Sequence, residues 1–585
     1  MIYMFNIKKI RNKALIFIYI GISVLVLFNY FYLQVINQKK YAILAGNNSV
    51  RPIRTFPPRG VIYDRNYFPL VDNRPLYDMK MISHDITNEI NYKLLEKHTG
   101  VNKNNIDSVI SLSYKIPGGK FKPLLLKRSI NFQTKAILEE SKLDLNGIYF
   151  SELPARVYTS NCQLTHVLGY LRQIDKDKLY NSDYQINDII GYSGIEKVYE
   201  SDLKGTFGID YFLVDRLGII QDRFQSDNDL SPVQGENVIL TINSNIQKYV
   251  EDSIVDFKGA VIIMDPKNGE IISLASSPNY NLSSFIGPIP ISTWKKLTGD
   301  SDKPFTNRAI QQTFPPGSIF KLVLAAMSLE NKIINKSWKV DCTGKYDFHN
   351  TTFRCWKEDG HGEVDLNDAI KKSCNIYFYH LMQKIDFNNW YSEITKFGFH
   401  SKTGIDLPDE KIGLIPNKKY MNRTYKNRGG WSKGHLLNLS IGQGEISVTP
   451  IQIINLINII ANRGKTFQPH LNLNFEAKEV MVNYNDKVWK DLREFMSNAV
   501  NSDGGTAYNA KINKKYGKVY GKTGTAQVCS NCDIEPHGWF AGFIELQNNK
   551  TYTICVIIEN GGKGSIIPTK IAKNIFNYII NISNV

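Results

Sequence analysis

The first 33 residues of this chain contain no acidic side chain, although the full sequence of 585 residues has 55 Asp and Glu. Residues 40 to 235 contain no glycine-rich phosphate loop, and no nucleic-acid-binding motif is found despite a formal net charge of +16. These absences argue against a nucleotide-dependent activity in the first half of the chain and against a nucleic-acid-binding protein. No Ser-His-Asp arrangement is indicated either, so any serine chemistry needs a different base.

One long stretch near the N-terminus is free of charge. It runs from Ala14 to Leu33 and is long enough to cross a bilayer. Several basic residues precede it: Lys8, Lys9, Arg11 and Lys13. The positive-inside rule therefore predicts a cytoplasmic tail at 1–13, a single transmembrane anchor at 14–35 and an extracytoplasmic remainder. A cleaved signal peptide is the alternative, which the length of the stretch and the lack of a small-x-small site disfavour.

The most informative pattern is Ser318-Ile319-Phe320-Lys321, which follows Phe314-Pro315-Pro316-Gly317. A serine and a lysine three residues apart lie on the same side of a helix. The preceding prolines and glycine predict that this helix begins at the serine, where backbone N–H groups can stabilise an oxyanion. Taken alone, S-x-x-K is a weak signal and often marks only a solvated helix face.

Two further motifs follow in order. Ser373-Cys374-Asn375 starts 55 residues after Ser318, and Lys522-Thr523-Gly524-Thr525 starts 149 residues after Ser373. Each could have a purely structural role, as a capping segment in the first case and as a strand with a bulge in the second. The order S-x-x-K, S-x-N, K-[ST]-G is, however, typical of penicillin-binding proteins and serine β-lactamases. The chain therefore resembles these acyl-transfer enzymes.

The chemistry of acyl transfer gives the first motif its expected roles. Serine is a weak nucleophile at neutral pH and needs an adjacent base. Lys321 is the candidate base for Ser318, provided that it is neutral when it acts. Burial and a nearby cation, for which Lys522 is the candidate, both lower the pKa of a lysine.

The second and third motifs are expected to bind the substrate and move its proton. Ser373 can relay a proton to the leaving amine, and Asn375 can hold the substrate amide. A strand is expected from Val519 to Val528, and its motif residues can bind a substrate carboxylate: Lys522, Thr523, Gly524 and Thr525. The Thr525 N–H would serve as the second oxyanion donor beside that of Ser318.

Further segments extend the resemblance over most of the chain. It is similar to the class B penicillin-binding proteins, and most of all to the elongation type called penicillin-binding protein 2. The segments that carry the resemblance are Pro58-Arg59-Gly60, Pro154-Ala155-Arg156, His166 to Tyr170, Gly194-Ile195-Glu196-Lys197, Asn307-Arg308-Ala309, Ile441 to Glu445 and Thr449-Pro450.

The resemblance implies a D,D-transpeptidase that cross-links peptidoglycan stem peptides ending in D-Ala-D-Ala during cell elongation and cell-shape maintenance. Such an enzyme is acylated by β-lactams, needs no cofactor for acyl transfer, and resides in the inner membrane with a periplasmic catalytic domain. Nothing before residue 235 resembles a glycosyltransferase, so the implied partners are a separate membrane-embedded SEDS-family glycosyltransferase and the elongation complex. The net positive charge of the chain has two interpretations. It can reflect a lysine-rich composition with no functional role, or it can attract the protein to anionic lipid head groups or wall polymers.

The expected fold class is α+β. Strands are predicted at Gly259 to Asp265 and Glu270 to Ser276, and again at Gly538 to Leu546 and Tyr552 to Glu559, with helices at Ser244 to Val255 and Pro568 to Ile580. An antiparallel sheet flanked by terminal helices agrees with the fold of penicillin-recognising enzymes. We expect this transpeptidase domain at 236–585 and a pedestal or dimerisation domain of short mixed elements at 36–235.

Cysteine is more abundant than an extracytoplasmic chain would need, with seven in all. Cys342, Cys355, His361 and Cys374 have the ligand types of a closed tetrahedral zinc site. Some elongation-type family members have aspartates near the first two positions, where this chain has cysteines. A Cys342–Cys355 disulfide and free thiols are the alternatives.

The other cysteines give weaker signals. Cys529 and Cys532 could form a local disulfide or a metal half-site with His537, or neither. Cys162 and Cys555 are interpreted as small buried hydrophobic residues.

Rival functions use overlapping motifs. A serine β-lactamase or β-lactam sensor shares all three, but no residue is evident that would position a deacylating water. The septal class B transpeptidase shares the chemistry, and an inactive scaffold is disfavoured by the complete motifs.

Overall fold

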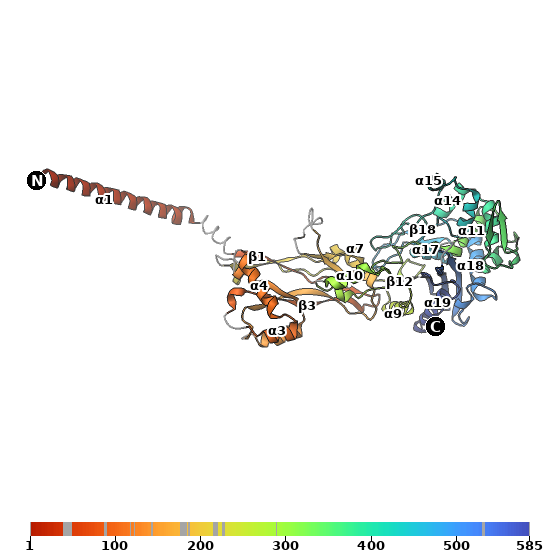
Figure 1. The fold of residues 1–585 in the computed structure, drawn as a ribbon, viewed down its shortest axis with the longest axis horizontal. Helices are drawn as coiled ribbons and strands as arrows, with labels where there is room; N and C mark the ends of the chain where they lie inside the picture. Colours follow the sequence, from red (N-terminus) through yellow and green to blue (C-terminus); the bar gives the residue numbers. More distant parts are fainter. Residues whose placement is uncertain are drawn as a thin grey trace. The chain divides into compact units, whose positions relative to one another are not determined.

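The computed structural model describes residues 2–38, 50–86, 90–116, 119–121, 123–141, 144–175, 184, 188–214, 220–224, 229–287, 289–528 and 533–583. The chain divides into two compact units, each built from discontinuous segments (Figure 1). The first unit comprises Met1–Pro58, Pro75–Pro154 and Gly205–Gln234. The second comprises Arg59–Arg74, Ala155–Lys204 and Gly235–Val585.

The chain begins with α1 (Ile2–Phe31), which continues into a π-helical turn (Tyr32–Ile36). The segment Leu15–Ile36 is long and apolar enough to cross a membrane, and none of its apolar window is buried in the protein. An exposed apolar helix of this length is what a bilayer requires, because its backbone bonds are satisfied internally. The helix thus fits the expected single anchor.

The rest of the first unit combines strands and helices. Its elements are β1 (Val50–Thr55), the end of β3 (Pro69–Met81), α3 (Tyr92–Thr99), α4 (Lys103–Lys115), β4 (Leu124–Ile130), α5 (Phe132–Glu140), the start of β5 (Ile148–Tyr158), β8 (Gly208–Val214) and β9 (Ile220–Phe224). β1, β8 and β9 form a three-stranded antiparallel sheet, while β4 pairs with the end of β3. A separate core, which includes Met79, Leu95 and Ile106, fills the space between β3 and the helices.

The second unit is organised by a five-stranded antiparallel sheet. The strand order is β12-β11-β21-β20-β19, with bounds Ile271–Ser277, Gly259–Met264, Thr551–Ile558, His537–Leu546 and Gly517–Ala526. The two hairpins that the turn residues predict, β11–β12 and β20–β21, are therefore confirmed. β19 lies at the edge of the sheet, so half of its backbone N–H and C=O groups face away from β20.

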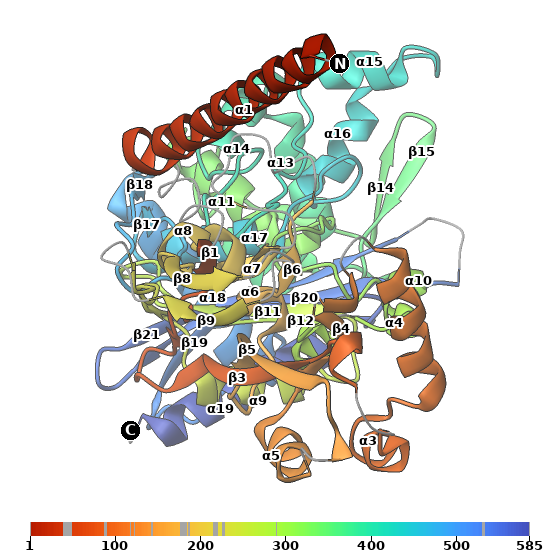
Figure 2. The ribbon, with the colours of Figure 1, turned by 90° about the vertical axis from the view of Figure 1, so that its left-hand side faces the viewer.

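Strand alternation divides the second unit into two cores. Along β11, Val261 and Ile263 face one core and Ala260, Ile262 and Met264 face the other. The first core lies under α9 (Ser244–Ser253) and α19 (Ile567–Ile582), the two expected terminal helices. Figure 2 shows these two helices together on one side of the sheet.

The other face of the sheet is covered by the larger helical layer. Its principal helices are α11 (Lys321–Glu330), α12 (Leu366–Lys371), α13 (Asn375–Gln383), α14 (Phe387–Thr395), α15 (Lys418–Tyr425), α16 (Lys433–Ser440), α17 (Pro450–Ala461) and α18 (Asp486–Asn501). Two small antiparallel pairs precede α12: β13 (Val340–Cys342) with β16 (Gly362–Val364), and β14 (Lys345–Phe348) with β15 (Thr351–Arg354). The expected α+β class, an antiparallel sheet flanked by helices, is confirmed.

Three of the segments that carry the sequence resemblance meet inside the second unit. Glu196, which is fully buried, accepts hydrogen bonds from Arg156 Nε at 2.7 Å and from Arg59 at 2.7 Å. Although burial opposes its ionisation, the two guanidinium groups hold the pKa of Glu196 below its ordinary value. Removing one partner of a buried ion pair costs about 3–5 kcal/mol, so this triad binds distant segments firmly together.

The remaining elements of the second unit are short. They are β2 (Ile62–Tyr63), α6 (Thr165–Leu168), β6 (Leu171–Gln173), β7 (Ile189–Gly191), α7 (Gly194–Val198), α8 (Glu200–Leu203), β10 (Val238–Ile239), α10 (Ile291–Gly299), β17 (Lys465–Phe467) and β18 (Glu479–Met481). β10 pairs in parallel with β2, which places Val238 and Ile239 beside Ile62 and Tyr63, shortly after Arg59 in the chain.

Candidate active site

Ser318 lies in a single 3-10 turn, Gly317–Ile319, directly before α11. The sequence predicts a helix that begins at this serine, whereas α11 itself begins at Lys321. Gly317 has φ +54°, and a side chain there would lie 2.9 Å from the carbonyl oxygen of Thr525. The glycine therefore lets the serine turn approach the edge strand β19 closely.

The serine turn is held from two directions. Gly317 N–H donates to the carbonyl oxygen of Gly442 at 2.9 Å. On the other side, Trp539 Nε1 in β20 donates to the carbonyl oxygen of Pro315 at 3.1 Å. Sequence reasoning identifies the segment that contains Gly442 as part of the family resemblance, but it does not predict that Gly442 contacts the serine turn. It misses Trp539, which is marked only by its place in a strong apolar strand pattern.

Two buried ammonium groups meet at one serine hydroxyl. Lys321 Nζ contacts Ser373 Oγ at 3.4 Å and donates to the carbonyl oxygen of Ser373 at 2.9 Å. Lys522 Nζ donates to Ser373 Oγ at 2.9 Å and to the carbonyl oxygen of Thr523 at 3.0 Å. Both lysine side chains are fully buried. Burying a lysine without an ion pair is costly, and such groups are concentrated at functional sites.

Burial sets the protonation of both lysines. It lowers the pKa of Lys321 to about 8, although the nearby thiols of Cys355, Cys374 and Cys342 act in the opposite direction. Burial also lowers the pKa of Lys522 well below its ordinary value, and repulsion from Lys321 adds to this effect. An amine that is partly neutral near pH 8 can accept a proton from a serine hydroxyl.

The S-x-N motif provides the other contacts of the site. Asn375 Oδ1 accepts from Lys321 Nζ at 2.7 Å, and Asn375 is the first residue of α13. Ser373 is 6% exposed and has φ +55°, a left-handed conformation that is uncommon for residues other than glycine. Backbone strain of this kind is often found at active sites.

The K-T-G-T motif occupies the edge strand as expected. Thr523 Oγ1 donates to Thr506 Oγ1 at 3.1 Å, and Gly564 N–H donates to Thr525 Oγ1 at 3.3 Å. Gly524 faces the serine turn, because a side chain there would lie 2.9 Å from the carbonyl oxygen of Pro316. Thr506 is a neighbour that sequence reasoning misses; the Gly504-Gly505 pair before it is the only signal.

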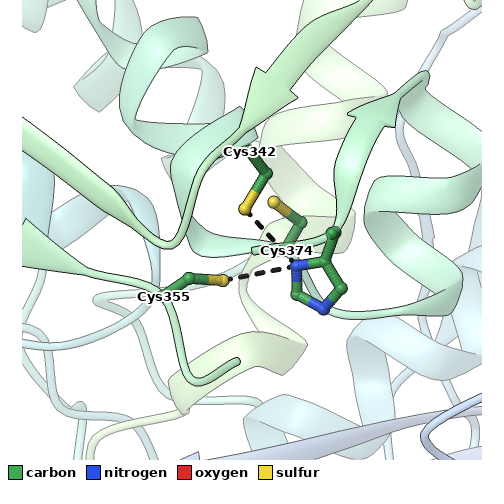
Figure 3. A group of neighbouring side chains, drawn as sticks. Cys342, Cys355 and Cys374 are labelled. Atoms are coloured by element: carbon green, nitrogen blue, oxygen red, sulfur yellow. Dashed lines mark hydrogen bonds between the residues drawn. The ribbon is translucent and has the colours of Figure 1, made fainter. Parts of the chain in front are cut away.

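A second cluster lies immediately beside the S-x-N motif. The ligand atoms of Cys342, Cys355, His361 and Cys374 all lie within 4.8 Å of one another. His361 Nδ1 is 3.5 Å from the sulfur atoms of both Cys342 and Cys355 (Figure 3). All three cysteines are buried free thiols, so the alternative Cys342–Cys355 disulfide is not formed in this structure.

Hydrogen bonding among the thiols separates their pKa values. Sharing a proton with Cys374 lowers the pKa of the Cys342 and Cys355 thiols, while the pKa of Cys374 itself is raised. Burial would lower the pKa of His361, but hydrogen bonds to Cys355 and Cys342 raise it. A cluster in which thiolates form readily is favourable for a cation.

The cysteine cluster is joined directly to the active-site motif. Asn375 N–H donates to Cys355 Sγ at 3.4 Å, and Asn375 Nδ2 donates to the carbonyl oxygen of Arg354 at 3.3 Å. Cys374 lies between Ser373 and Asn375 in the chain. The end of the β14–β15 hairpin thus positions the residue that also contacts Lys321.

The other cysteine predictions divide into two groups. Cys162 and Cys555 are buried, as expected for small hydrophobic residues, and burial raises the pKa of Cys162 to about 12. Cys529 and Cys532 lie outside the described residues.

Comparison with known proteins agrees with this arrangement. The family model for the penicillin binding protein transpeptidase domain matches residues 259–577, and the model for the penicillin-binding protein dimerisation domain matches residues 54–240. The first of these covers more than half of the chain and includes every residue of the candidate site.

Whole-chain relatives extend the match. The peptidoglycan D,D-transpeptidase MrdA of Acinetobacter baumannii is 30% identical over 615 residues, which cover 98% of this chain and 89% of the relative. MrdA of Salmonella typhimurium is 28% identical over 597 residues, covering 95% of this chain and 93% of the relative. The structure of the Helicobacter pylori penicillin-binding protein PBP2 in complex with MreC has a TM-score of 0.78 at 27% identity and covers 92% of this chain and 100% of that chain. The chain therefore belongs to the penicillin-binding protein transpeptidase family, in the class B, elongation-type group that its sequence resembles.

Proposed function

We propose that this protein is a peptidoglycan D,D-transpeptidase that acts through an acyl-enzyme on Ser318. The observation that carries the proposal is the meeting of two buried amines, Lys321 and Lys522, on the hydroxyl of Ser373. The named relatives are D,D-transpeptidases, and the serine turn, the S-x-N motif and the edge strand are the three parts that acyl transfer needs.

Lys321 is the proposed general base. In its neutral form it takes the proton of Ser318 Oγ as that oxygen attacks the carbonyl carbon of the penultimate D-Ala. The attack forms a tetrahedral oxyanion, which the backbone N–H groups of Ser318 and Thr525 stabilise. The pKa of Lys321, about 8, supports this role because an appreciable fraction of the amine is neutral near physiological pH.

Ser373 is the proposed proton relay to the leaving group. Collapse of the tetrahedral intermediate breaks the amide bond, and the proton held by Lys321 passes through Ser373 Oγ to the departing D-Ala amine. The acyl chain stays on Ser318 until the amine of a second stem peptide attacks it. Asn375 orients the substrate amide, and the substrate carboxylate is bound by Lys522, Thr523, Gly524 and Thr525.

We further propose that the cysteine cluster binds a structural Zn²⁺. Zn–S and Zn–N bonds of about 2.3 and 2.05 Å in a tetrahedron place a sulfur and a nitrogen ligand about 3.6 Å apart. The observed separation of 3.5 Å between His361 Nδ1 and two of the sulfur atoms fits this requirement. With Cys342, Cys355, His361 and Cys374 as ligands the ion would have no open position, so it would support the loop at Ser373 rather than take part in catalysis.

The domain arrangement that we propose places the catalytic part outside the membrane. Residues 1–13 form a cytoplasmic tail, 14–35 a membrane anchor, 36–235 a pedestal and 236–585 the periplasmic transpeptidase domain. Supporting observations are the apolar segment Leu15–Ile36 and the two family-model matches.

Partners are proposed from the relatives and from the surface of the first unit. The Helicobacter pylori PBP2 structure is a complex with MreC, and we propose that this chain works in an elongation complex with a SEDS-family glycosyltransferase. Leu112, Tyr114 and Phe132 in the first unit are large apolar residues that are 48%, 65% and 65% exposed. Exposed apolar side chains of this kind fit a protein contact.

The test is labelling with a fluorescent penicillin. Full-length protein and its Ser318→Ala variant are incubated with the drug, and the adduct is followed by gel and intact mass over hours. A long-lived adduct that is absent from the variant supports the proposal. Rapid turnover of the drug would instead indicate a β-lactamase, and an adduct that persists in the variant would exclude Ser318 as the nucleophile.

A further inference from the structure

One part of the second unit carries an unbalanced positive charge. Between Glu410 and Glu445 the sequence has no Asp or Glu. Helix α15 and the loop after it contribute five exposed cations, which we call the α15 patch: Lys418, Lys419, Arg423, Lys426 and Arg428. Within the described residues, none of these five side chains forms a salt bridge, so their charge is available to a partner.

The patch is built by helical periodicity. Lys418, Lys419, Arg423 and Lys426 recur at the spacing that places side chains on the outer face of a helix. The inner face carries the buried Met421 and the half-buried Tyr425 and Tyr420. The cations therefore share one solvent-facing surface.

Specific contacts fix this surface in position. Asn417 caps α15 by accepting from Tyr420 N–H at 2.8 Å. Trp431 Nε1, in the loop that follows α15, donates to Asn422 Oδ1 at 2.6 Å. The hydroxyl of Tyr425 donates to Glu445, so the carboxylate that follows the acid-free segment is already engaged. These contacts hold the backbone that carries the patch, so only its side chains must be ordered on binding.

Helix α16 (Lys433–Ser440), which follows the patch in the chain, connects to the candidate active site at both of its ends. A side chain at Gly434 in α16 would lie 3.7 Å from Phe353 of the β14–β15 hairpin, whose last residue accepts from Asn375. On the other side, α16 runs into the loop at Gly442, which accepts from Gly317 beside Ser318. The patch therefore directly precedes, along the chain, a helix that contacts both the support of the S-x-N motif and the serine turn.

We propose that the α15 patch binds the carboxylate groups of an uncross-linked peptidoglycan strand and so holds a polymeric substrate for the candidate active site. The inference rests on the proposed function, because stem peptides carry free carboxylates in addition to the terminal one that the K-T-G-T strand would bind. Exposed arginine and lysine pair with carboxylates weakly one at a time, but a repeating strand engages several at once.

The experiment compares two full-length variants that each lose five positive charges. The patch variant is Lys418→Gln, Lys419→Gln, Arg423→Gln, Lys426→Gln and Arg428→Gln. The control variant is Lys295→Gln, Lys296→Gln, Lys514→Gln, Lys515→Gln and Lys570→Gln, at exposed positions outside α15. Fluorescence anisotropy measures the binding of soluble uncross-linked strands, and thermal melting checks that both variants are folded.

The expected result is that the patch variant binds strands at least about fivefold more weakly at low salt, while the control stays within about twofold of the wild type. Salt near 1 M, where the screening length is about 3 Å, should remove the difference. Strands whose carboxylates have been converted to amides should bind wild type and patch variant equally. Equal losses in the two variants would overturn the proposal, because net charge alone would then account for binding.

Two further measurements distinguish strand binding from lipid binding, and the patch from the acyl-transfer site. If the patch variant loses affinity for phosphatidylglycerol vesicles but keeps its affinity for strands, the patch is a lipid-binding surface and the proposal is wrong. Fluorescent penicillin labels the wild-type protein in parallel. Unlabelled wild type would refute the acyl-transfer proposal independently, whereas labelled protein that binds strands equally well with and without the patch would refute this inference alone.

Discussion

The pH dependence of acylation should report the ionisation of Lys321. Burial lowers the pKa of this lysine from 10.5 to about 8. The neutral fraction at pH 7 is then about one in ten, compared with about one in three thousand for an ordinary lysine, a gain of roughly 300-fold. If the neutral amine is the base, the second-order rate constant of penicillin acylation should increase with pH. Up to pH 7 it should increase about tenfold per pH unit, and it should level off above pH 9, with its midpoint near 8.

Stopped-flow or quenched-gel kinetics with a fluorescent penicillin between pH 6 and 9.5 would measure this profile. The titration of Lys522 could in principle mimic it, so a Lys522→Met variant serves as the control. Its residual acylation should keep a midpoint near 8, because burial rather than Lys522 is the main cause of the low pKa of Lys321. A rate that is flat from pH 6 to 9, or one that still rises steeply at pH 9.5, would refute the assignment of Lys321 as the base.

Three further predictions test the supports of the site. Cys374→Ser should lower zinc content and melting temperature together. The control Cys555→Ser, at a buried thiol outside the cluster, should keep its metal. Wild-type protein that is well folded without zinc would contradict the metal site. Gly442→Ala should slow acylation and destabilise by about 1–3 kcal/mol, since its new methyl group would lie 2.3 Å from the carbonyl oxygen of Gly317; unchanged kinetics would show that this contact does not position Ser318. Glu196→Gln should cost about 3–5 kcal/mol in chemical unfolding at pH 7. Because the folded pKa of Glu196 is lowered, its stabilisation is present above the unfolded pKa and lost as pH falls below it, so wild type and variant should converge in acid.

The sheet could be predicted because its signals are local. The turn Pro266-Lys267-Asn268-Gly269 lies between two apolar runs, and β11 and β12 meet across it with nearly the expected bounds. Helix α19 has a proline at its start and apolar residues at helical spacing, and it packs on the sheet. Turn residues and periodicity each act over a few positions, which is the range that a single sequence reveals.

The contacts that hold the site could not be predicted, because they join segments that are far apart in the sequence. The glycine pair before Thr506 does not indicate that the Thr506 hydroxyl meets Thr523, and the apolar pattern around Trp539 does not indicate that its indole holds Pro315. The compact units are also discontinuous: residues 155–204 cluster with the transpeptidase segment although residues 75–154 do not. Because the predicted domains each consist of one continuous stretch, they could not show that each compact unit combines several separate segments.

The S-x-N motif likewise depends on neighbours that are distant in the sequence. The motif indicates which side chains meet the substrate, but Ser373 adopts φ +55°, a conformation that its own sequence does not favour. Two contacts from the end of the β14–β15 hairpin fix the next functional residue, one to the backbone and one to the side chain of Asn375. The strained backbone at Ser373 persists because these contacts, together with the hydrogen bonds of the two lysines, hold it in place. The cysteines that the sequence offers as a metal site are thus part of the structure that positions the catalytic motif, and loss of the cluster should affect acylation as well as stability.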